Sequence, residues 1–194
     1  MKKLGKGLVL GVIWVLVLPA GLTARIEHRV FRSALLFEFF SQWFALHPGL
    51  PGRLARACFY QQTLRQGHLD LDIGFASTIS KIETSVGRGV LITGHTTVGY
   101  AEIGDGAVIA NHVSILSGRY QHNFTDPGQG ILAGNDSFSM VRIGAGSFIG
   151  ENSVVMADVG SLTIVGAGSV VVKPLPDSVV AVGNPARVVK RRES

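Results

Sequence analysis

The chain has 194 residues, a formal net charge of +5 and 46% hydrophobic residues, and its mean hydropathy of +0.34 is high for a soluble protein. This length allows one main domain with an appendage. A single cysteine, Cys58, excludes an intramolecular disulfide, and because no histidine lies near it we expect a packed thiol. No basic stretch interleaved with aromatic residues occurs in the second half of the chain, so nucleic-acid binding is not expected.

The first 24 residues are predicted to be a hydrophobic membrane anchor. Three lysines open the chain, and an uncharged run over residues 7–24 follows them. This run is at the short end of the length that spans a bilayer. A cleaved secretory signal has the same layout, and a buried core helix is a third interpretation. Pro19 and the apolar segment after the run favour retention at the membrane.

Residues 25–68 are predicted to be an amphipathic and basic helical segment. Phe31, Leu35, Phe39 and Trp43 recur every four residues and form one broad apolar face. The pattern predicts a helix over residues 25–46 that either lies in the bilayer interface or packs against the rest of the protein. A stretch rich in Pro and Gly ends it, and a short basic helix is expected to follow.

Residues 69–188 carry a six-residue period of aliphatic side chains. The clearest units are Ile103-Gly-Asp-Gly-Ala-Val-Ile109, Ile143-Gly-Ala-Gly-Ser-Phe-Ile149 and Val165-Gly-Ala-Gly-Ser-Val-Val171. This period matches neither the 3.6-residue repeat of a helix nor a hairpin meander with longer strands. It predicts a mainly β protein, a parallel β-helix, in which each short strand turns an aliphatic side chain inward and glycine occupies corners.

A long polar interruption over residues 117–141 breaks the period, and a basic tail over residues 189–194 ends the chain. Long loops that project from a rigid scaffold are common places for chemistry. Of the histidines, His95 and His112 lie within the repeats and His122 lies within the interruption. These three are the candidates for a functional role.

In these features the chain resembles the hexapeptide-repeat acyltransferases, and within them the sugar O-acetyltransferase branch. The resemblance covers roughly Ile73 to Arg187. Beside the repeat, it rests on the interruption Ser117-Gly-Arg-Tyr-Gln-His122 and on the closing run Gly166-Ala-Gly-Ser-Val-Val-Val-Lys173, which is followed by Gly183-Asn-Pro-Ala-Arg187. It implies a left-handed parallel β-helix, usually assembled as a homotrimer.

The resemblance also implies an enzyme that moves an acyl group, acetyl in the first instance, from acyl-CoA to a sugar hydroxyl. Acetyl-CoA is the implied co-substrate, and no metal is implied. Because the membrane anchor suits an acceptor carried on lipid, we expect a surface polysaccharide or a lipid-linked glycan as acceptor. The catalytic domain is expected to face the cytoplasm from the inner membrane, where acyl-CoA is found, with membrane lipids as further partners.

His122 is the general base that the resemblance implies, because the family's base lies at the start of this interruption. Imidazole can take a hydroxyl proton near neutral pH. Asp126 or Asn111 would orient a histidine ring, and His112 is the alternative base. If three repeats make one coil, as in the family, His95 and His112 stack on one edge of successive coils, about one strand spacing apart.

The remaining candidate residues fall into two groups. The acceptor-binding residues are expected to be His95, His112 and Tyr120, and the cofactor-binding residues to be Gly144, Ala145, Gly150, Ala167, Gly168, Lys173 and Arg187. Two alternatives stay open. One is a non-catalytic or metal-binding β-helix resembling the γ-type carbonic anhydrases, in which histidines hold a metal ion. The other is an enzyme that acylates an aminosugar nitrogen or uses an acyl-carrier protein.

Overall fold

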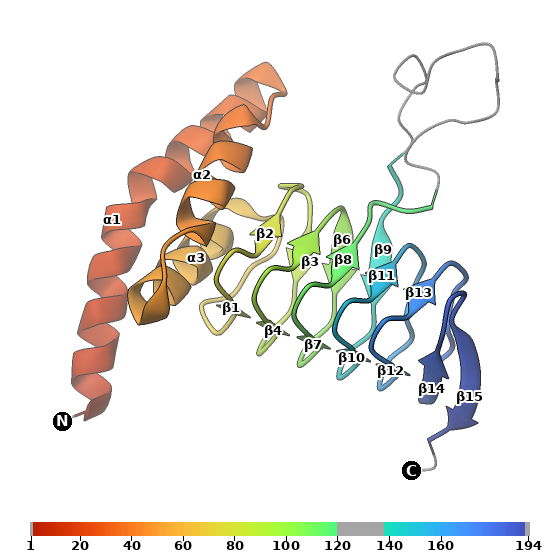
Figure 1. Ribbon diagram of the computed structural model, residues 1–194. Helices are drawn as coiled ribbons and strands as arrows, with labels where there is room; N and C mark the ends of the chain where they lie inside the picture. The colour runs from red at the N-terminus through yellow and green to blue at the C-terminus, as the bar shows by residue number, and fades with distance from the viewer. Residues whose placement is uncertain (1, 120–137, 193–194) are drawn as a thin grey trace.

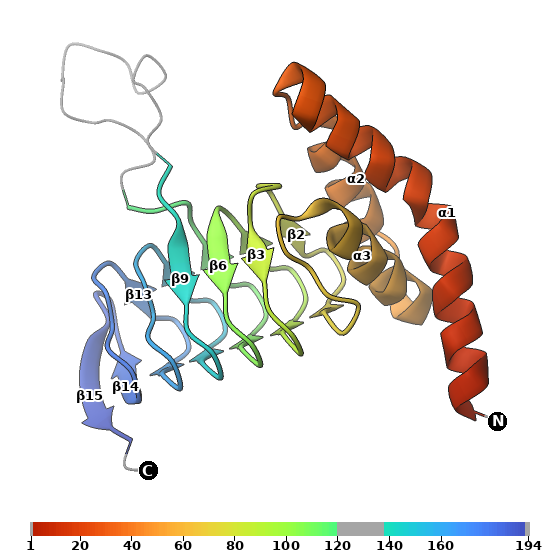
Figure 2. The same ribbon diagram turned by 180° about the vertical axis from the view of Figure 1, so that it is seen from behind.

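The computed structural model of the protein describes residues 2–119 and 138–192, and it consists of a helical layer followed by a prism of stacked coils (Figure 1 and Figure 2). The layer contains helices α1 (Lys2–Phe31), α2 (Leu35–Ala45) and α3 (Gly49–Thr63). It covers the N-terminal end of the prism, and the last strands lie at the opposite end.

The prism has three sheets as its walls, and successive strands pass from one wall to the next. Within a wall each strand pairs in parallel with the strands one coil before and after it, apart from the last strand. The seven-stranded sheet contains β1 (Asp72–Ile73), β4 (Leu91–Ile92), β7 (Val108–Ile109), β10 (Phe148–Ile149), β12 (Ile164–Val165), β14 (Val179–Val182) and β15 (Arg187–Arg191). The five-stranded sheet contains β2 (Thr78–Ile79), β5 (Thr97–Val98), β8 (Ser114–Ile115), β11 (Val154–Val155) and β13 (Val170–Val171). The three-stranded sheet contains β3 (Ser85–Val86), β6 (Ala101–Ile103) and β9 (Val141–Ile143).

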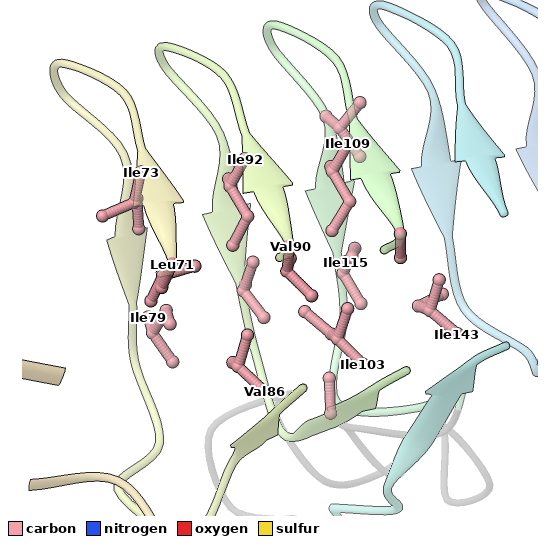
Figure 3. Close-up of a cluster of buried hydrophobic side chains, with 14 of the residues drawn as sticks. Leu71, Ile73, Ile79, Val86, Val90, Ile92, Ile103, Ile109, Ile115 and Ile143 are labelled. Carbon is pink, nitrogen blue, oxygen red and sulfur yellow. The ribbon is translucent and has the colours of Figure 1, made fainter. Parts of the chain in front are cut away.

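The interior of the prism is a set of aliphatic columns. In each two-residue strand the second residue points inward and is buried. Ile73, Ile92 and Ile109 are register partners on successive coils and form one such column (Figure 3). Burying one side chain of this size stabilises the fold by about 1.5–3 kcal/mol. The six-residue period therefore reports the inward positions of the walls, and the predicted parallel β-helix is confirmed.

The helical layer is joined to the first coil by a buried hydrogen-bond network around Tyr60. The Tyr60 hydroxyl accepts a hydrogen bond from the Ile79 N–H at 3.0 Å and lies 2.7 Å from Ser41 Oγ. The Ser41 hydroxyl in turn donates to the Ile79 carbonyl oxygen at 3.1 Å. Burial raises the pKa of the Tyr60 hydroxyl, so it stays a neutral donor. Strand β2 thus meets polar partners from α2 and α3 where a preceding coil would otherwise lie.

Arg56 makes a second connection between the layer and the prism. Its guanidinium is buried and donates to the Ile73 carbonyl oxygen at 2.9 Å, and to the Phe44 and His47 carbonyl oxygens at 3.0 and 2.8 Å. Burial lowers the pKa of Arg56, yet an arginine stays charged in proteins. The buried charge of Arg56 is therefore stabilised by backbone carbonyl dipoles at the end of α2 and in β1.

The helix predicted over residues 25–46 is in fact two helices, and this expectation was wrong. Helix α1 continues through the predicted end of the anchor at residue 24 and stops at Phe31. The turn that follows is fixed by Glu27, whose carboxylate accepts hydrogen bonds from Ser33 Oγ and from the Leu36 N–H, both at 2.8 Å. An acidic residue that the periodicity assigned to a helix surface therefore sets the angle between α1 and α2.

The basic tail predicted over residues 189–194 is exposed in its described part but is not irregular. Its described part belongs to β15, which pairs antiparallel with β14 through Val180 with Lys190 and Val179 with Arg191. The alternation of short aliphatic and basic residues suits an edge strand, because charged side chains keep the outer edge from pairing with another chain. The tail is thus part of the end of the prism.

Helix α1 is the one described helix that is long and apolar enough to cross a membrane by length and composition. Its apolar part is Gly7–Phe31, with a mean hydropathy of 2.2, and 22% of its most apolar window is buried in the structure. Helix α1 packs along α3, where Trp14 Nε1 donates to Gln61 Oε1 at 2.9 Å, and it also contacts α2.

Replacing Tyr60 by Phe is expected to destabilise the protein by about 1–3 kcal/mol, because the buried Ile79 N–H would lose its acceptor and the Ser41 oxygen would lose its donor. Thermal or urea unfolding of the two proteins measures this difference. Tyr100→Phe is the matched control, since the Tyr100 hydroxyl has no hydrogen bond to a described residue. Equal losses in both variants would show that the network does not join the layer to the prism.

Candidate active site

Each coil turns three corners, and the corners of successive coils stack into three edges of the prism. We name the corner between the seven-stranded and five-stranded sheets the histidine edge, and the next two the loop edge and the glycine edge. Backbone hydrogen bonds between coils define them. The histidine edge comprises residues 75–76, 94–95, 111–112, 150–152 and 167–168; the loop edge comprises 80–84, 99–100, 116–118, 156–158 and 172–174; and the glycine edge comprises 88–89, 105–106, 144–146, 161–162 and 177–178.

The histidine edge carries a pair of stacked imidazole rings. The ring centroids of His95 and His112 are 5.0 Å apart and the planes differ by 14°. Both residues have a φ near +57°, and their N–H groups donate to Phe75 and Gly94 carbonyl oxygens of the preceding coil at 2.9 and 3.1 Å. The predicted stacking is therefore confirmed. Both rings are exposed and can contact a ligand, and their role in acceptor binding stays a prediction.

Asn111, a candidate partner of a catalytic histidine, is occupied by hydrogen bonds within the same edge. Its Oδ1 accepts from the Gly94 N–H at 2.8 Å, and its Nδ2 donates to Glu151 Oε1 at 2.7 Å. These bonds join three coils and hold the corner that carries His112. The described contacts give Asn111 a positioning role for this corner, and its part in catalysis stays a prediction.

The loop edge holds both ends of the interruption at one point. The buried hydroxyl of Ser117 accepts the Tyr100 N–H at 2.8 Å, and the Ser117 carbonyl oxygen accepts the Ser139 N–H at 2.9 Å. After the gap, the Phe138 ring lies under Lys81, whose Nζ is 4.4 Å from the ring centroid. The coil therefore closes as if the interruption were an ordinary corner.

His122, Asp126 and Tyr120 lie outside the described residues, so their predicted roles stay predictions. The structure places the two ends of their segment on the loop edge. The stacked histidines lie on the neighbouring edge, separated from the loop edge by the five-stranded wall. Within one chain, the segment that contains the predicted base is therefore attached to the loop edge, whereas the predicted acceptor-binding histidines His95 and His112 lie on the histidine edge.

The predicted cofactor-binding residues are distributed over the prism and are not brought together within one chain. Gly150, Ala167 and Gly168 lie at the histidine edge, Gly144 and Ala145 lie at the glycine edge, Lys173 lies on the loop edge, and Arg187 is in β15. The reason is geometric, because each six-residue unit advances the chain to the next wall. Sequence repeats that look alike therefore occupy different edges.

Two of these glycines have a structural explanation. A Cβ at Gly144 would lie 2.2 Å from the Ser161 nitrogen, and one at Gly150 would lie 2.5 Å from the Ala167 nitrogen. Both positions need the close approach of the next coil. Gly168 differs, because its added Cβ would meet open space and glycine there is favoured instead by a φ of +69°. Its exposed corner, next to Ala167, is the part of the set that a ligand can reach directly.

Neither a reactive thiol nor a metal cluster is found among the described residues. Cys58 is buried in α3, and burial raises the pKa of its thiol to about 11, so almost no thiolate is present at neutral pH. Among the described residues, no three or more His, Cys, Asp or Glu side chains are grouped to hold a metal ion. His122, the third histidine of the metal alternative, lies outside this part of the chain.

No protein-family model and no curated protein sequence matches the chain, but solved structures do. A maltose O-acetyltransferase from Clostridium difficile 630 superposes with a TM-score of 0.71 at 24% identity, over 84% of this chain and 91% of that chain. The chain has the fold of the hexapeptide-repeat acetyltransferases. A galactoside acetyltransferase in complex with coenzyme A has a TM-score of 0.64 at 22% identity, over 81% of this chain and 80% of that chain.

A third match is the hexapeptide-repeat acetyltransferase VCA0836 from Vibrio cholerae O1 biovar eltor, complexed with acetyl-CoA. Its TM-score is 0.62 at 16% identity, over 81% of this chain and 86% of that chain. Structures of this fold are left-handed β-helices. These three matches cover more of this chain than the prism contains, so the structural similarity extends into the helical layer.

Sequence reasoning missed an apolar outer face on the seven-stranded wall. The outward residue of each strand there is apolar in all coils after the first: Leu91, Val108, Phe148, Ile164 and Val180. In the five-stranded wall the same position holds Thr or Ser in the first three coils. The signal was present as pairs of adjacent large apolar residues, but the six-residue count reads only the inward member of each pair.

Proposed function

We propose that this protein is a membrane-associated O-acetyltransferase, which transfers the acetyl group of acetyl-CoA to a sugar hydroxyl of a surface polysaccharide or a lipid-linked glycan. The observation that carries the proposal is the shared fold, which includes helices as well as coils. Solved structures of this fold hold coenzyme A or acetyl-CoA. The maltose and galactoside enzymes support a sugar acceptor and favour transfer to oxygen.

The proposed chemistry needs one proton acceptor and one oxyanion donor. The neutral imidazole of His122 takes the proton of the sugar hydroxyl while its oxygen attacks the thioester carbonyl carbon. A backbone N–H stabilises the tetrahedral oxyanion. The intermediate then collapses to the acetyl ester and releases the thiolate of coenzyme A, which accepts the proton that the imidazole took from the sugar hydroxyl. His95 and His112 line the acceptor side of this site, with Tyr120 from the same segment as the base.

His122→Ala is expected to lower kcat by about 10²–10⁴-fold, which is the usual contribution of a positioned general base. The KM for acetyl-CoA should change little, because the proposed cofactor residues lie on the coils. Thioester consumption with a sugar acceptor measures the rate, and the melting temperature checks the fold.

His95→Ala and His112→Ala are the matched controls for this experiment. Full activity in a folded His122→Ala protein would contradict the assignment. Loss of activity in His112→Ala alone would move the base to the histidine edge. Loss of a bound metal ion, measured by mass spectrometry in all three variants, would favour the carbonic-anhydrase-like alternative.

We further propose that the protein is a homotrimer in which the seven-stranded walls face one another. This wall presents the apolar outer row that includes Val108 and Phe148, and Phe148 is 41% exposed in the single chain. Exposed apolar rows of this kind mark sites of association. The histidine edge and the glycine edge border this wall. Packing the walls together would bring the glycine edge of one subunit, with Gly144 and Ala145, close to the histidine edge of the next, with Gly150, Ala167 and Gly168.

Val108→Asp combined with Phe148→Asp should abolish the trimer and the activity together, because stacked carboxylates would replace apolar side chains in the interface. Sedimentation velocity gives the mass. Thr97→Asp with Ser114→Asp is the matched control for the oligomeric state, since these residues are also outward register partners on adjacent coils. An unchanged mass for the first variant, or equal dissociation of both, would place the interface elsewhere.

The proposed membrane association is supported by the outer surface of the helical layer. Helices α1 and α2 lie side by side (Figure 1), and apolar side chains remain exposed along both. They include Leu8, Val12, Val15, Leu16, Leu35, Phe39, Trp43 and Leu46, with exposed fractions from 53% to 73%. Because α1 bonds to the polar helix α3 at Trp14, we propose that it lies in the membrane interface with α2, with the prism in the cytoplasm at the inner membrane.

Phe39→Gln with Trp43→Gln should weaken binding to phosphatidylcholine–phosphatidylglycerol vesicles at least about tenfold, because each large apolar side chain contributes about 1.5–3 kcal/mol on full burial. Leu162→Gln with Val189→Gln is the control, since both residues are exposed apolar side chains near the other end of the prism. Unchanged binding would contradict the interfacial layer. Recovery of a mature chain that begins near Arg25 in the periplasm would contradict the location.

A further inference from the structure

A cleft of about 860 Å³ lies where the helical layer meets the prism. Its walls are the C-terminal half of α1, the end of α3 and the first two corners of the loop edge. Figure 2 shows the end of α1 on the same side of the coils as the stretch that leads into β9. This cleft contains none of the residues that the sequence suggested for catalysis or for the cofactor.

The cleft is rich in uncompensated positive charge. Arg29, Arg32 and Arg65 line it with exposed side chains, and none of them forms an ion pair with a described residue. Arg25 adds a fourth guanidinium, which donates to the Gln62 carbonyl oxygen at 3.2 Å. Guanidinium groups that converge without carboxylates favour phosphate, which they bind through paired charge-assisted hydrogen bonds.

The acidic residues nearby do not neutralise these arginines. Glu83 is the one carboxylate that lines the cleft, and it lies 3.5 Å from His28 Nε2. Glu27 faces the turn before α2, where it accepts hydrogen bonds from Ser33 and Leu36. The four guanidinium groups thus exceed the available negative charge, and the cleft is suited to an anion that carries more than one charge.

Apolar side chains form the remaining part of the cleft. Leu22 and Ile26 lie on the same turns of α1 as the arginines, and Leu64 and Ile82 face them from α3 and the first corner. Leu22 and Ile26 are 49% and 56% exposed. An anion without an apolar part, such as inorganic pyrophosphate, would leave these apolar side chains in water. A ligand that joins a phosphate group to a hydrocarbon chain would cover both surfaces.

The position of the cleft agrees with such an amphiphilic ligand. It adjoins α1, whose outer face carries the exposed apolar side chains of the layer. A helix with its side chains is about 10–12 Å across, so a cleft beside a helix that lies in the interface is at the depth of the lipid headgroups. The hydrocarbon chain of a ligand could therefore stay in the bilayer while its phosphate occupies the cleft.

We infer that this cleft binds the phosphate or diphosphate group of a lipid-linked acceptor, with the start of the hydrocarbon chain along Leu22 and Ile26. As an acceptor site, this inference rests on the proposed function. Tyr100 lines the cleft, and its N–H is bonded to Ser117, where the interruption begins. Adjacent coils are about 4.8 Å apart. A sugar attached to a phosphate in the cleft therefore lies about one coil from Ser117, where the interruption begins.

The test measures binding by the full-length protein in phosphatidylcholine nanodiscs, with farnesyl diphosphate as the probe. Arg29→Gln with Arg65→Gln should weaken this binding by about tenfold to a hundredfold, because two charge-assisted contacts are lost. Arg88→Gln with Arg191→Gln removes the same charge from exposed sites on the prism and should change the Kd less than about twofold. Leu22→Gln with Ile26→Gln should weaken the binding of farnesyl diphosphate and leave the binding of inorganic pyrophosphate unchanged.

Three competing ligands show whether the cleft prefers a lipid-linked diphosphate, a free diphosphate, a nucleotide or a membrane headgroup. Farnesyl diphosphate should bind at least tenfold more tightly than inorganic pyrophosphate, uridine diphosphate or added phosphatidylglycerol. Equal binding of phosphatidylglycerol would show a general headgroup site, and tighter binding of uridine diphosphate would show a nucleotide site. Either result overturns the inference, as does equal binding by the cleft and control variants.

Binding of acetyl-CoA is measured in parallel on the same proteins. It should be retained in the Arg29→Gln/Arg65→Gln variant, which shows that the variant is folded. If the wild-type protein binds farnesyl diphosphate but not acetyl-CoA, the proposed enzymatic function fails and the cleft stands as a lipid-phosphate site. If it binds acetyl-CoA and transfers acetyl groups but does not bind farnesyl diphosphate, the inference about the cleft is wrong and the proposed function stands.

Discussion

Each coil of this protein makes its wall hydrogen bonds with other coils rather than within itself. This constraint determines most of the architecture. A coil cannot fold alone, since both its backbone groups and its inward aliphatic residue need a neighbour above and below. Stacking also fixes the register, so equivalent corners form continuous edges. The same physics that builds a uniform interior thus lines up side chains from distant parts of the sequence, as with His95 and His112.

The walls and the edges of the prism hold different kinds of residue. Inward wall positions hold aliphatic residues, mostly Ile and Val, because any polar group there would be buried without a partner. Outward wall positions are free to vary, which allows an apolar row around Phe148 on one wall and Thr97 or Ser114 on another. Corners tolerate histidine, asparagine and glycine, and there the backbone stays close to solvent. The proposed functional residues therefore lie mainly on edges, while the proposed trimer depends on a wall.

Much of this could be predicted from the sequence, and the successes share a cause. The interior is periodic, so Ile73, Ile92 and Ile109 reveal it by spacing alone, and the histidine stack follows once three units make a coil. The failures concern single contacts that periodicity does not encode. Glu27 turns the chain between α1 and α2, and the last basic residues pair with β14. The cleft was missed because Arg29 and Arg65 are far apart in sequence and meet only when α1 packs beside the first coil.

The two ends of the prism are finished in different ways. Tyr60, Ser41 and Arg56 cover the first coil from the helical layer, and β15 runs against the direction of every other strand in its sheet. A stack of parallel coils could in principle grow without limit, since each new coil presents the same unpaired backbone groups as the coil before it. Here neither end can serve as a template for another copy. Growth along the axis is closed, and the flanks of the prism are the surfaces left for self-assembly. A particle of fixed size, rather than a fibre, is the outcome that this topology permits.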